Sequence, residues 1–229
     1  MILAIAAAIA AVQAPAAACP DVVTPQAFTC RALQASNAGN SEEAAQAFEQ
    51  AANAQSENEA EKARLWAAAG NMWIAANQPG KAAMALDKAL TGTGLQAEQR
   101  GEALLDRARA AEAQNDLKMA RSKVTEAART VSEDPFLWYF SAALAIREND
   151  AATAQSSIGE ALKLAPSDPT VLFEAGHVAH FAGDETKARY YWQQAASADP
   201  NGQSGKAARE ALGMLAAPAT VTKPAQPPK

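Results

Sequence analysis

Two histidines, the only ones in this 229-residue sequence, stand three residues apart at His177 and His180. Residues with this spacing share one face of a helix, and Glu174 and Asp184 would add a carboxylate on either side. Imidazole and carboxylate groups together are common metal ligands, zinc in particular. The sequence has no cysteine cluster and no HExxH pattern, so the competing interpretation is a pair of histidines that line a surface.

Motifs for catalysis and for nucleic-acid binding are absent from the sequence. It has neither a GxSxG nucleophile motif nor a GxxxxGK phosphate loop, and paired acids such as Glu42 and Glu43 fit a solvated helix face. The net charge is −5, with acids and bases interleaved and no basic stripe. We therefore expect a protein that is not an enzyme, carries no cofactor and binds no nucleic acid.

The two cysteines, Cys19 and Cys30, enclose the short segment CPDVVTPQAFTC. In an oxidising compartment an even cysteine count favours a disulfide. The alternative is that Cys19 carries the lipid of a bacterial lipoprotein. Ala16 stands where the leucine of that signal is usual, so we favour the disulfide.

The compartment is suggested by residues 1–18, MILAIAAAIAAVQAPAAA, which have no charged side chain and end in small residues at Ala16 and Ala18. This composition predicts a signal peptide cleaved before Cys19 and export to the bacterial periplasm. The apolar run from Ile2 to Val12 is too short to span a bilayer. No lysine or arginine precedes that run, and a buried N-terminal helix is the alternative.

A repeat organises the rest of the chain. Pro135 and Pro169 are 34 residues apart, as are Pro166 and Pro200, and the apolar pattern between them recurs at the same step. After an N-terminal segment, 19–24, the register predicts an array over 25–216. Its units are 25–58, 63–100, 101–134, 135–168 and 169–202, followed by a capping helix at 203–216. Residues 217–229 form a proline-rich sequence that predicts a disordered tail.

Each unit has the same columns of residues. The expected first helix carries a bulky residue and the second a small residue followed by a bulky one, with Gly or Asn between the helices. Gly and Asn can adopt the left-handed conformation that ends a helix. The bulky column of the second helices is Phe48, Leu86, Val124, Ile158 and Trp192, and the small one is Ala44, Ala82, Ala120, Ala154 and Ala188.

This pattern resembles the tetratricopeptide repeat, whose signature is W-x2-L-G-x2-Y, then A-x3-F and P. The second unit gives Trp66-x2-Ala69-Gly70-x2-Trp73, then Ala82-x3-Leu86, and the third unit departs from the signature at Arg107 and Ser132. The resemblance implies an all-α fold, a right-handed superhelical solenoid of five helix pairs plus the capping helix. It also implies a concave side, lined by the first helices, that binds peptides.

The resemblance places most of the candidate binding residues toward the C-terminal end of that concave side. Tetratricopeptide domains that clamp a carboxylate use a lysine where this sequence has Ala67, so binding of a chaperone tail is not implied. In the first unit the same places hold small polar residues, Gln26, Thr29 and Asn37, beside Leu33. The predicted peptide-binding residues are Asn71, Arg109, Phe136, Tyr139, Arg147, Phe173, His177, His180 and Phe181.

Our sequence-based interpretation is therefore a protein-interaction scaffold of the bacterial cell envelope, of the exported type. It would bind a peptide or protein segment in its groove, anchored at Phe173 and its aromatic neighbours. The alternative is a periplasmic protein that binds a ligand or metal through His177 and His180. No partner is identified by the sequence.

Overall fold

The computed structural model describes residues 18–216, so the predicted signal peptide, except Ala18, and the predicted tail at 217–229 lie outside the described residues. Between residues 18 and 216 the chain forms α-helices and no strands, which confirms the all-α prediction. In this range ten helices make five consecutive pairs and the eleventh follows them. The helices are α1 (Pro25–Asn37), α2 (Ser41–Ala54), α3 (Glu59–Ala75), α4 (Pro79–Leu90), α5 (Ala97–Ala113), α6 (Leu117–Ala127), α7 (Pro135–Arg147), α8 (Ala151–Leu164), α9 (Pro169–Phe181), α10 (Glu185–Ala198) and α11 (Gln203–Ala216).

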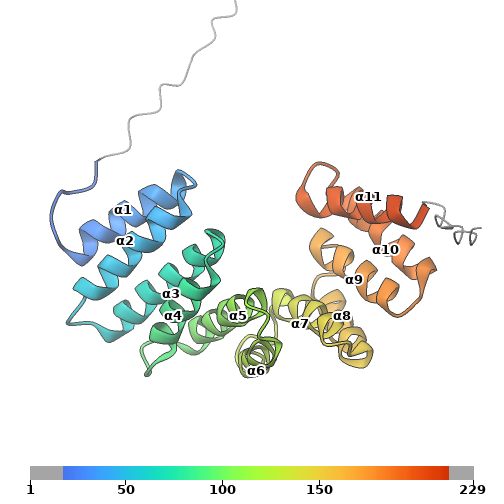
Figure 1. Cartoon of the computed structure of the whole chain (residues 1–229), viewed down its shortest axis with the longest axis horizontal. Helices are drawn as coiled ribbons and strands as arrows, with labels where there is room; N and C mark the ends of the chain where they lie inside the picture. Colours follow the sequence, from blue (N-terminus) through green and yellow to red (C-terminus); the bar gives the residue numbers. More distant parts are fainter. Residues whose placement is uncertain (1–17, 217–229) are drawn as a thin grey trace, which may run out of the picture.

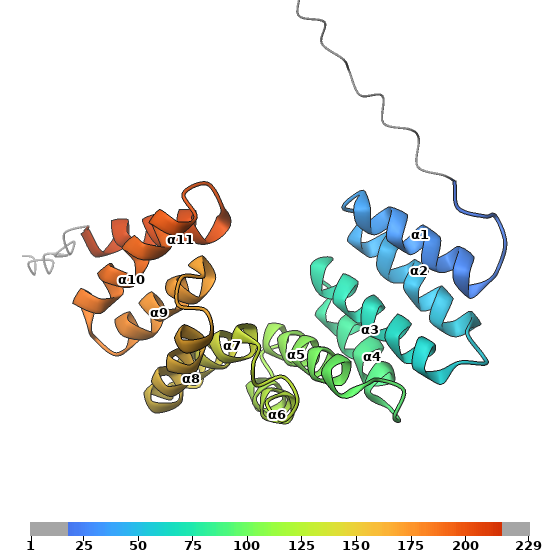
Figure 2. The same cartoon turned by 180° about the vertical axis from the view of Figure 1, so that it is seen from behind.

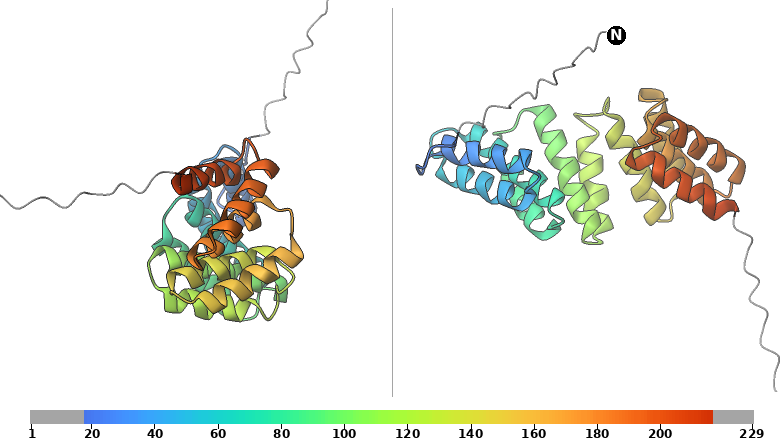
Figure 3. Two further views of the ribbon diagram at one scale, coloured as in Figure 1. Left: turned by 90° about the vertical axis from the view of Figure 1, so that its right-hand side faces the viewer. Right: turned by 90° about the horizontal axis from the view of Figure 1, so that it is seen from above.

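The pairs are arranged as an open arch (Figure 1). The first helices α5, α7 and α9 lie on the inner side, and their partners α6, α8 and α10 lie on the outer side (Figures 1 and 2). Seen from above, the pairs succeed one another side by side from the N-terminal to the C-terminal end (Figure 3). The arch thus presents one continuous concave side formed by successive first helices.

The turns within the pairs have the expected left-handed residue. Asn77, Asn115 and Asn149 have φ values of 55°, 61° and 58°, and Gly39 and Gly183 take φ values of 79° and 77° at the equivalent places. The following aspartate caps the second helix in the last three pairs, where its side chain accepts from a backbone N–H at 3.0 Å. The first two pairs have no such side-chain cap on α2 and α4. The caps of the other three are Asp116, Asp150 and Asp184.

The repeated columns form the core. All five bulky residues of the second helices are buried, and the five small residues beside them have no exposed surface. Close packing depends on glycine in two pairs, because a Cβ at Gly70 would overlap Leu86 and one at Gly176 would overlap Trp192. The columns therefore fix how closely the two helices of a pair approach.

Two irregularities of the third unit have structural explanations. Arg107, which replaces a leucine of the repeat signature, pairs with Asp87 of α4 at 2.7 Å. Ser132, which replaces the closing proline, accepts a hydrogen bond on its carbonyl oxygen from Trp138 Nε1 at 2.7 Å. Both departures thus contribute contacts between neighbouring units.

Two of the first helices, α3 and α5, begin before the predicted unit boundaries. Helices α3 and α5 have 17 residues each, whereas α1, α7 and α9 have 13. The boundaries predicted at residues 63 and 101 fall inside α3 and α5 as a result. Between α4 and α5, Arg100 holds the connecting segment by donating to the carbonyl oxygens of Leu90 at 2.9 Å and Gly92 at 3.3 Å.

Helix α11 covers the C-terminal end of the array. Its Ala208 is fully buried, and Leu212 and Leu215 pack against the cluster that contains Leu172 of α9 and Trp192 of α10. An end unit of a solenoid needs such a cover for its apolar face. Among the described helices, none has the length and apolar character needed to cross a membrane.

Candidate functional site

Side chains from three units meet in a continuous network on the concave side. Asp106 of α5 accepts a hydrogen bond from Asn71 Nδ2 of α3 at 2.8 Å and from Arg109 Nη1 at 2.9 Å. The guanidinium carbon of Arg109 lies 5.6 Å from the ring centre of Phe136 on α7, within the range of a cation–π contact. We call Asn71, Arg109 and Phe136, together with Asp106 and Tyr139, the central face.

Aromatic rings complete the central face on α7. The ring of Phe136 meets that of Tyr139 edge-on at 5.1 Å and stacks on Phe140 at 5.8 Å. Burial is the main cause that raises the pKa of Tyr139 to about 12, so its hydroxyl stays protonated and can donate a hydrogen bond. All three rings are only partly buried. The structure thus brings together four of the predicted residues, Asn71, Arg109, Phe136 and Tyr139, and adds Asp106, which the sequence analysis did not single out.

The rings of Phe173 and His177 were predicted to be an exposed anchor for a peptide, but they also make packing contacts within the protein. Phe173 meets His177 edge-on at 4.5 Å, and His177 meets Trp192 at 5.4 Å. Trp192 Nε1 donates to the Phe173 carbonyl oxygen at 3.1 Å. Phe173 also packs against the cluster that includes Leu212 and Leu215 of α11. These contacts hold the last pair and α11 together, so part of the predicted anchor contributes to packing.

Both histidine rings lie beside Trp192, with ring centres 5.4 Å away for His177 and 5.8 Å away for His180. His177 is half-buried, and burial, with a smaller contribution from His180, lowers the pKa of its imidazole. His180 is exposed, and its Nδ1 lies 2.9 Å from Glu185 Oε1. Asp184, the distal acid of the metal hypothesis, accepts from the Lys187 N–H at the start of α10. Within residues 18–216 no three His, Cys, Asp or Glu side chains gather closely enough to hold a metal ion.

The remaining two predicted residues lie at helix ends. Arg147, the last residue of α7, forms an ion pair with Glu112 of α5 and donates to Asn115 Oδ1 at 2.8 Å. It therefore braces the fourth unit against the third. Phe181 is the last residue of α9 and is partly buried. Neither residue belongs to the central face.

The N-terminal part of the concave side is hollowed, which its small polar residues did not predict. A hollow of about 920 Å³ lies between α1 and the start of α3, and Leu33 on its wall is 53% exposed. A second hollow, of about 450 Å³, continues between α1, α3 and α5 and includes Asn71 and Asp106 in its lining. The central face and these hollows thus form one surface that extends from α1 to α7.

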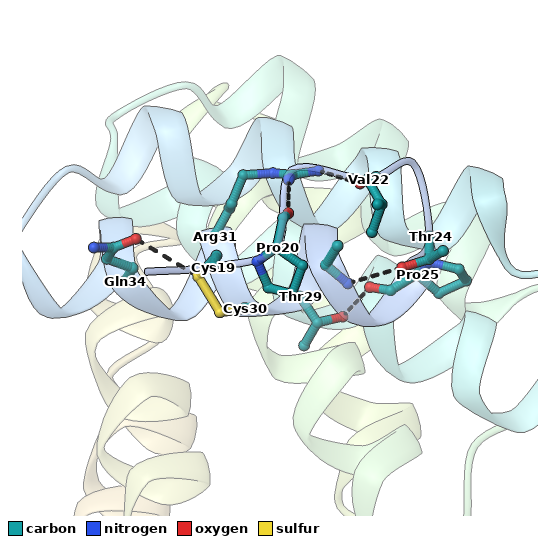
Figure 4. The surroundings of a disulfide bond; sticks show 10 residues. Cys19, Pro20, Val22, Thr24, Pro25, Thr29, Cys30, Arg31 and Gln34 are labelled. Carbon is teal, nitrogen blue, oxygen red and sulfur yellow. Dashed lines mark hydrogen bonds between the residues drawn. A yellow bond between two sulfur atoms is a disulfide. The ribbon is translucent and has the colours of Figure 1, made fainter. Parts of the chain in front are cut away.

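Cys19 and Cys30 line the larger hollow, and Figure 4 shows the disulfide between them. Cys19 and Cys30 are joined at an S–S distance of 2.04 Å, which ties the N-terminal segment to α1. Arg31 holds the same segment by donating to the carbonyl oxygens of Pro20 at 2.8 Å and Val22 at 3.2 Å. The segment therefore covers part of α1 at the N-terminal end of the arch.

Comparison with known proteins identifies the fold. No protein-family model matches the sequence, and no curated protein matches it. Solved structures do match. YrrB, described as a TPR protein with an unusual peptide-binding site, has a TM-score of 0.57 and 16% identity over 80% of this chain and 91% of its own. TTC0263, a TPR protein of Thermus thermophilus, has a TM-score of 0.61 and 17% identity over 83% of this chain and 99% of its own.

The chain has the tetratricopeptide-repeat fold. PilW, a type IV pilus biogenesis factor, is a further structural neighbour, with a TM-score of 0.66 and 16% identity over 80% of this chain and 81% of its own. The resemblance seen in the sequence is therefore confirmed at the level of fold.

Proposed function

We propose that this protein is an interaction scaffold of the bacterial cell envelope that binds a peptide or protein segment along its concave side. The observation that carries the proposal is the central face, because hydrogen bonds and ring contacts join side chains of three successive units there. Partly exposed aromatic rings beside an arginine are the side chains in which binding energy concentrates at protein interfaces. An extended segment that crosses the units would contact all of them.

The alternative of a metal-binding protein is less well supported. Both histidine rings contact Trp192, and His180 also contacts Glu185, but no third ligand joins them among the described residues. A binding scaffold also needs no reacting groups, and proteins with this fold are typically non-enzymatic scaffolds. We therefore propose binding, without catalysis, as the activity of the concave side.

The envelope location is proposed on the sequence of residues 1–18 and on the disulfide. Disulfides persist in the periplasm and are rare in the reducing cytosol. A Cys19 whose sulfur is bonded to Cys30 has no thiol to acylate, which supports a periplasmic protein over a lipoprotein. PilW, a type IV pilus biogenesis factor, has a related fold. This likeness is compatible with a role of the present protein in the envelope.

The proposal is tested by capturing envelope proteins with the mature protein and then measuring the affinity of the captured partner for variants. Phe136→Ala should weaken binding at least about tenfold, because a truncated aromatic anchor often costs about 2 kcal/mol. Tyr190→Ala is the matched control, since Tyr190 is 56% exposed on the outer helix α10. Unchanged affinity in a folded Phe136→Ala, Arg109→Ala double variant would rule out the concave side as the binding surface.

A further inference from the structure

Glu174 occupies an unusual position between the last two units. On α9 it lies on the same side as Val171, Ala175 and Val178, which are 1%, 2% and 3% exposed and pack against α7 and α8. The ring of Tyr139 packs against the same cluster from α7. The carboxyl group of Glu174 therefore lies at the seam between α7 and α9, close enough to Tyr139 to help raise the pKa of its hydroxyl.

This carboxyl group has no partner among residues 18–216. It takes part in no ion pair or hydrogen bond there, and burial alone raises its pKa to about 7. Every fully buried side-chain oxygen or nitrogen in the described chain has a hydrogen-bond partner, so the oxygens of Glu174 must reach the surface. A largely buried carboxylate without a partner is costly to ionise, and a bound cation would remove that cost.

The charged groups of the surrounding elements do not neutralise Glu174. Those that act electrostatically on the adjacent Tyr139 are Arg109, Asp168 and Asp134, besides Glu174 itself. Arg109 is paired with Asp106, Asp134 accepts from the Phe136 N–H, and Asp168 accepts from N–H groups at the start of α9. On α9 itself, burial lowers the pKa of His177, which keeps that ring neutral at pH 7. The seam therefore presents one carboxylate beside aromatic rings.

We propose that the seam between α7 and α9 binds a lysine or arginine side chain of the partner segment, with Glu174 as the counter-ion and the ring of Tyr139 beside the alkyl stem. Cations bind both to carboxylates and to aromatic faces, and both interactions strengthen when water is excluded. The net charge of the chain, −5, also favours a basic partner. The ring of Tyr139 joins the seam to the central face, so one segment can contact both. This inference rests on the proposed function and specifies the chemistry of its partner.

Two synthetic probes test the inference on the mature protein. Both are pentapeptides, acetylated at the N-terminus and amidated at the C-terminus. Two valines precede the central residue and two alanines follow it. That residue is lysine in one and norleucine, which has no ammonium group, in the other. NMR titration should show that the lysine peptide binds about tenfold more tightly at pH 8. At pH 6 Glu174 takes up a proton, so the ratio of the two affinities should be about tenfold smaller than at pH 8.

Matched variants assign the preference to one carboxylate. Glu174→Gln keeps the size of the side chain and should abolish the preference for lysine, whereas Glu210→Gln, at an exposed place on α11, should retain it. Equal binding of the two peptides, binding of neither, or a preference that survives Glu174→Gln would overturn the inference. If both peptides bind equally and Phe136→Ala weakens both, the proposed function stands and only the basic subsite is lost.

Discussion

The indole ring of Trp192 occupies the space that a side chain at Gly176 would need, because a Cβ at that position would overlap Nε1 and its neighbouring atoms. Gly70 and Leu86 repeat the relationship three units earlier. In both pairs, the bulky residue of the second helix packs onto a glycine of the first. This contact sets the distance between the helices of the pair, so its disruption should lower the stability of the protein.

Gly176→Ala should lower the free energy of unfolding by about 1–3 kcal/mol, as is usual for overpacking. Gly159→Ala in α8 is the matched control, since no atom lies within 4 Å of a Cβ built there, and replacing a helical glycine should stabilise by up to about 1 kcal/mol. Urea unfolding of both variants measures the difference. Stabilisation by both substitutions would show that Trp192 does not pack on Gly176.

Reduction of the Cys19–Cys30 disulfide, or a Cys19→Ser, Cys30→Ser double variant, should cost about 3 kcal/mol, the loop-closure entropy expected for a segment of this length. Units of a solenoid depend mainly on their neighbours, so hydrogen exchange should accelerate in α1 before α5 or α9. Intact-mass analysis of periplasmic protein provides a second check. A chain that begins at Cys19 and carries acyl groups would show a lipoprotein instead.

Glu174 should make stability depend on pH. Its pKa is raised from 4.5 to about 7 in the folded protein, so the folded state binds the proton more tightly than the unfolded state. Stability is therefore highest below pH 4.5 with respect to this group, and up to about 3 kcal/mol is lost as the pH rises from 4.5 to 7. Glu174→Gln should remove this loss in urea unfolding at pH 5 and pH 8. The same pH dependence in the variant would assign it to another group.

His177 should make stability depend on pH in the opposite direction to Glu174. Burial, followed by the nearby His180, lowers the pKa of its ring below the ordinary value of 6.5, so the unfolded chain binds the proton more tightly. Stability should fall as the pH decreases from 6.5 through the lowered value. His177→Gln should flatten this acid limb, as measured by thermal unfolding between pH 7 and pH 5. An acid limb of unchanged depth would contradict the burial of the ring.

Much of this fold could be predicted from local sequence. The 34-residue period and the turn residues identify the pairs because they depend on nearby backbone conformation, as the positive φ values of Asn77, Asn115 and Asn149 show. Residues 59–62, which lie between the first two predicted units, were harder to place, since sequence alone did not show that they belong to α3.

The candidate site was less predictable because it depends on contacts between units. Asn71 and Asp106 are 35 residues apart, and their hydrogen bond requires α3 and α5 to lie side by side. The repeat placed Phe173 on the concave side, but it did not reveal the contact with α11, which closes over the last pair. Glu174 was considered only as a metal ligand, since its burial depends on how α9 packs against α7.

Site-specific photo-crosslinking tests most directly whether partners bind the concave side. A benzophenone side chain would replace Phe136 on the central face or, in a second protein, Met84, which is 62% exposed on α4. After irradiation of living cells, we predict a discrete covalent adduct with another protein from position 136 and none from position 84. An adduct from position 84 alone, with none from position 136 in a folded protein, would contradict the assignment of binding to the concave side.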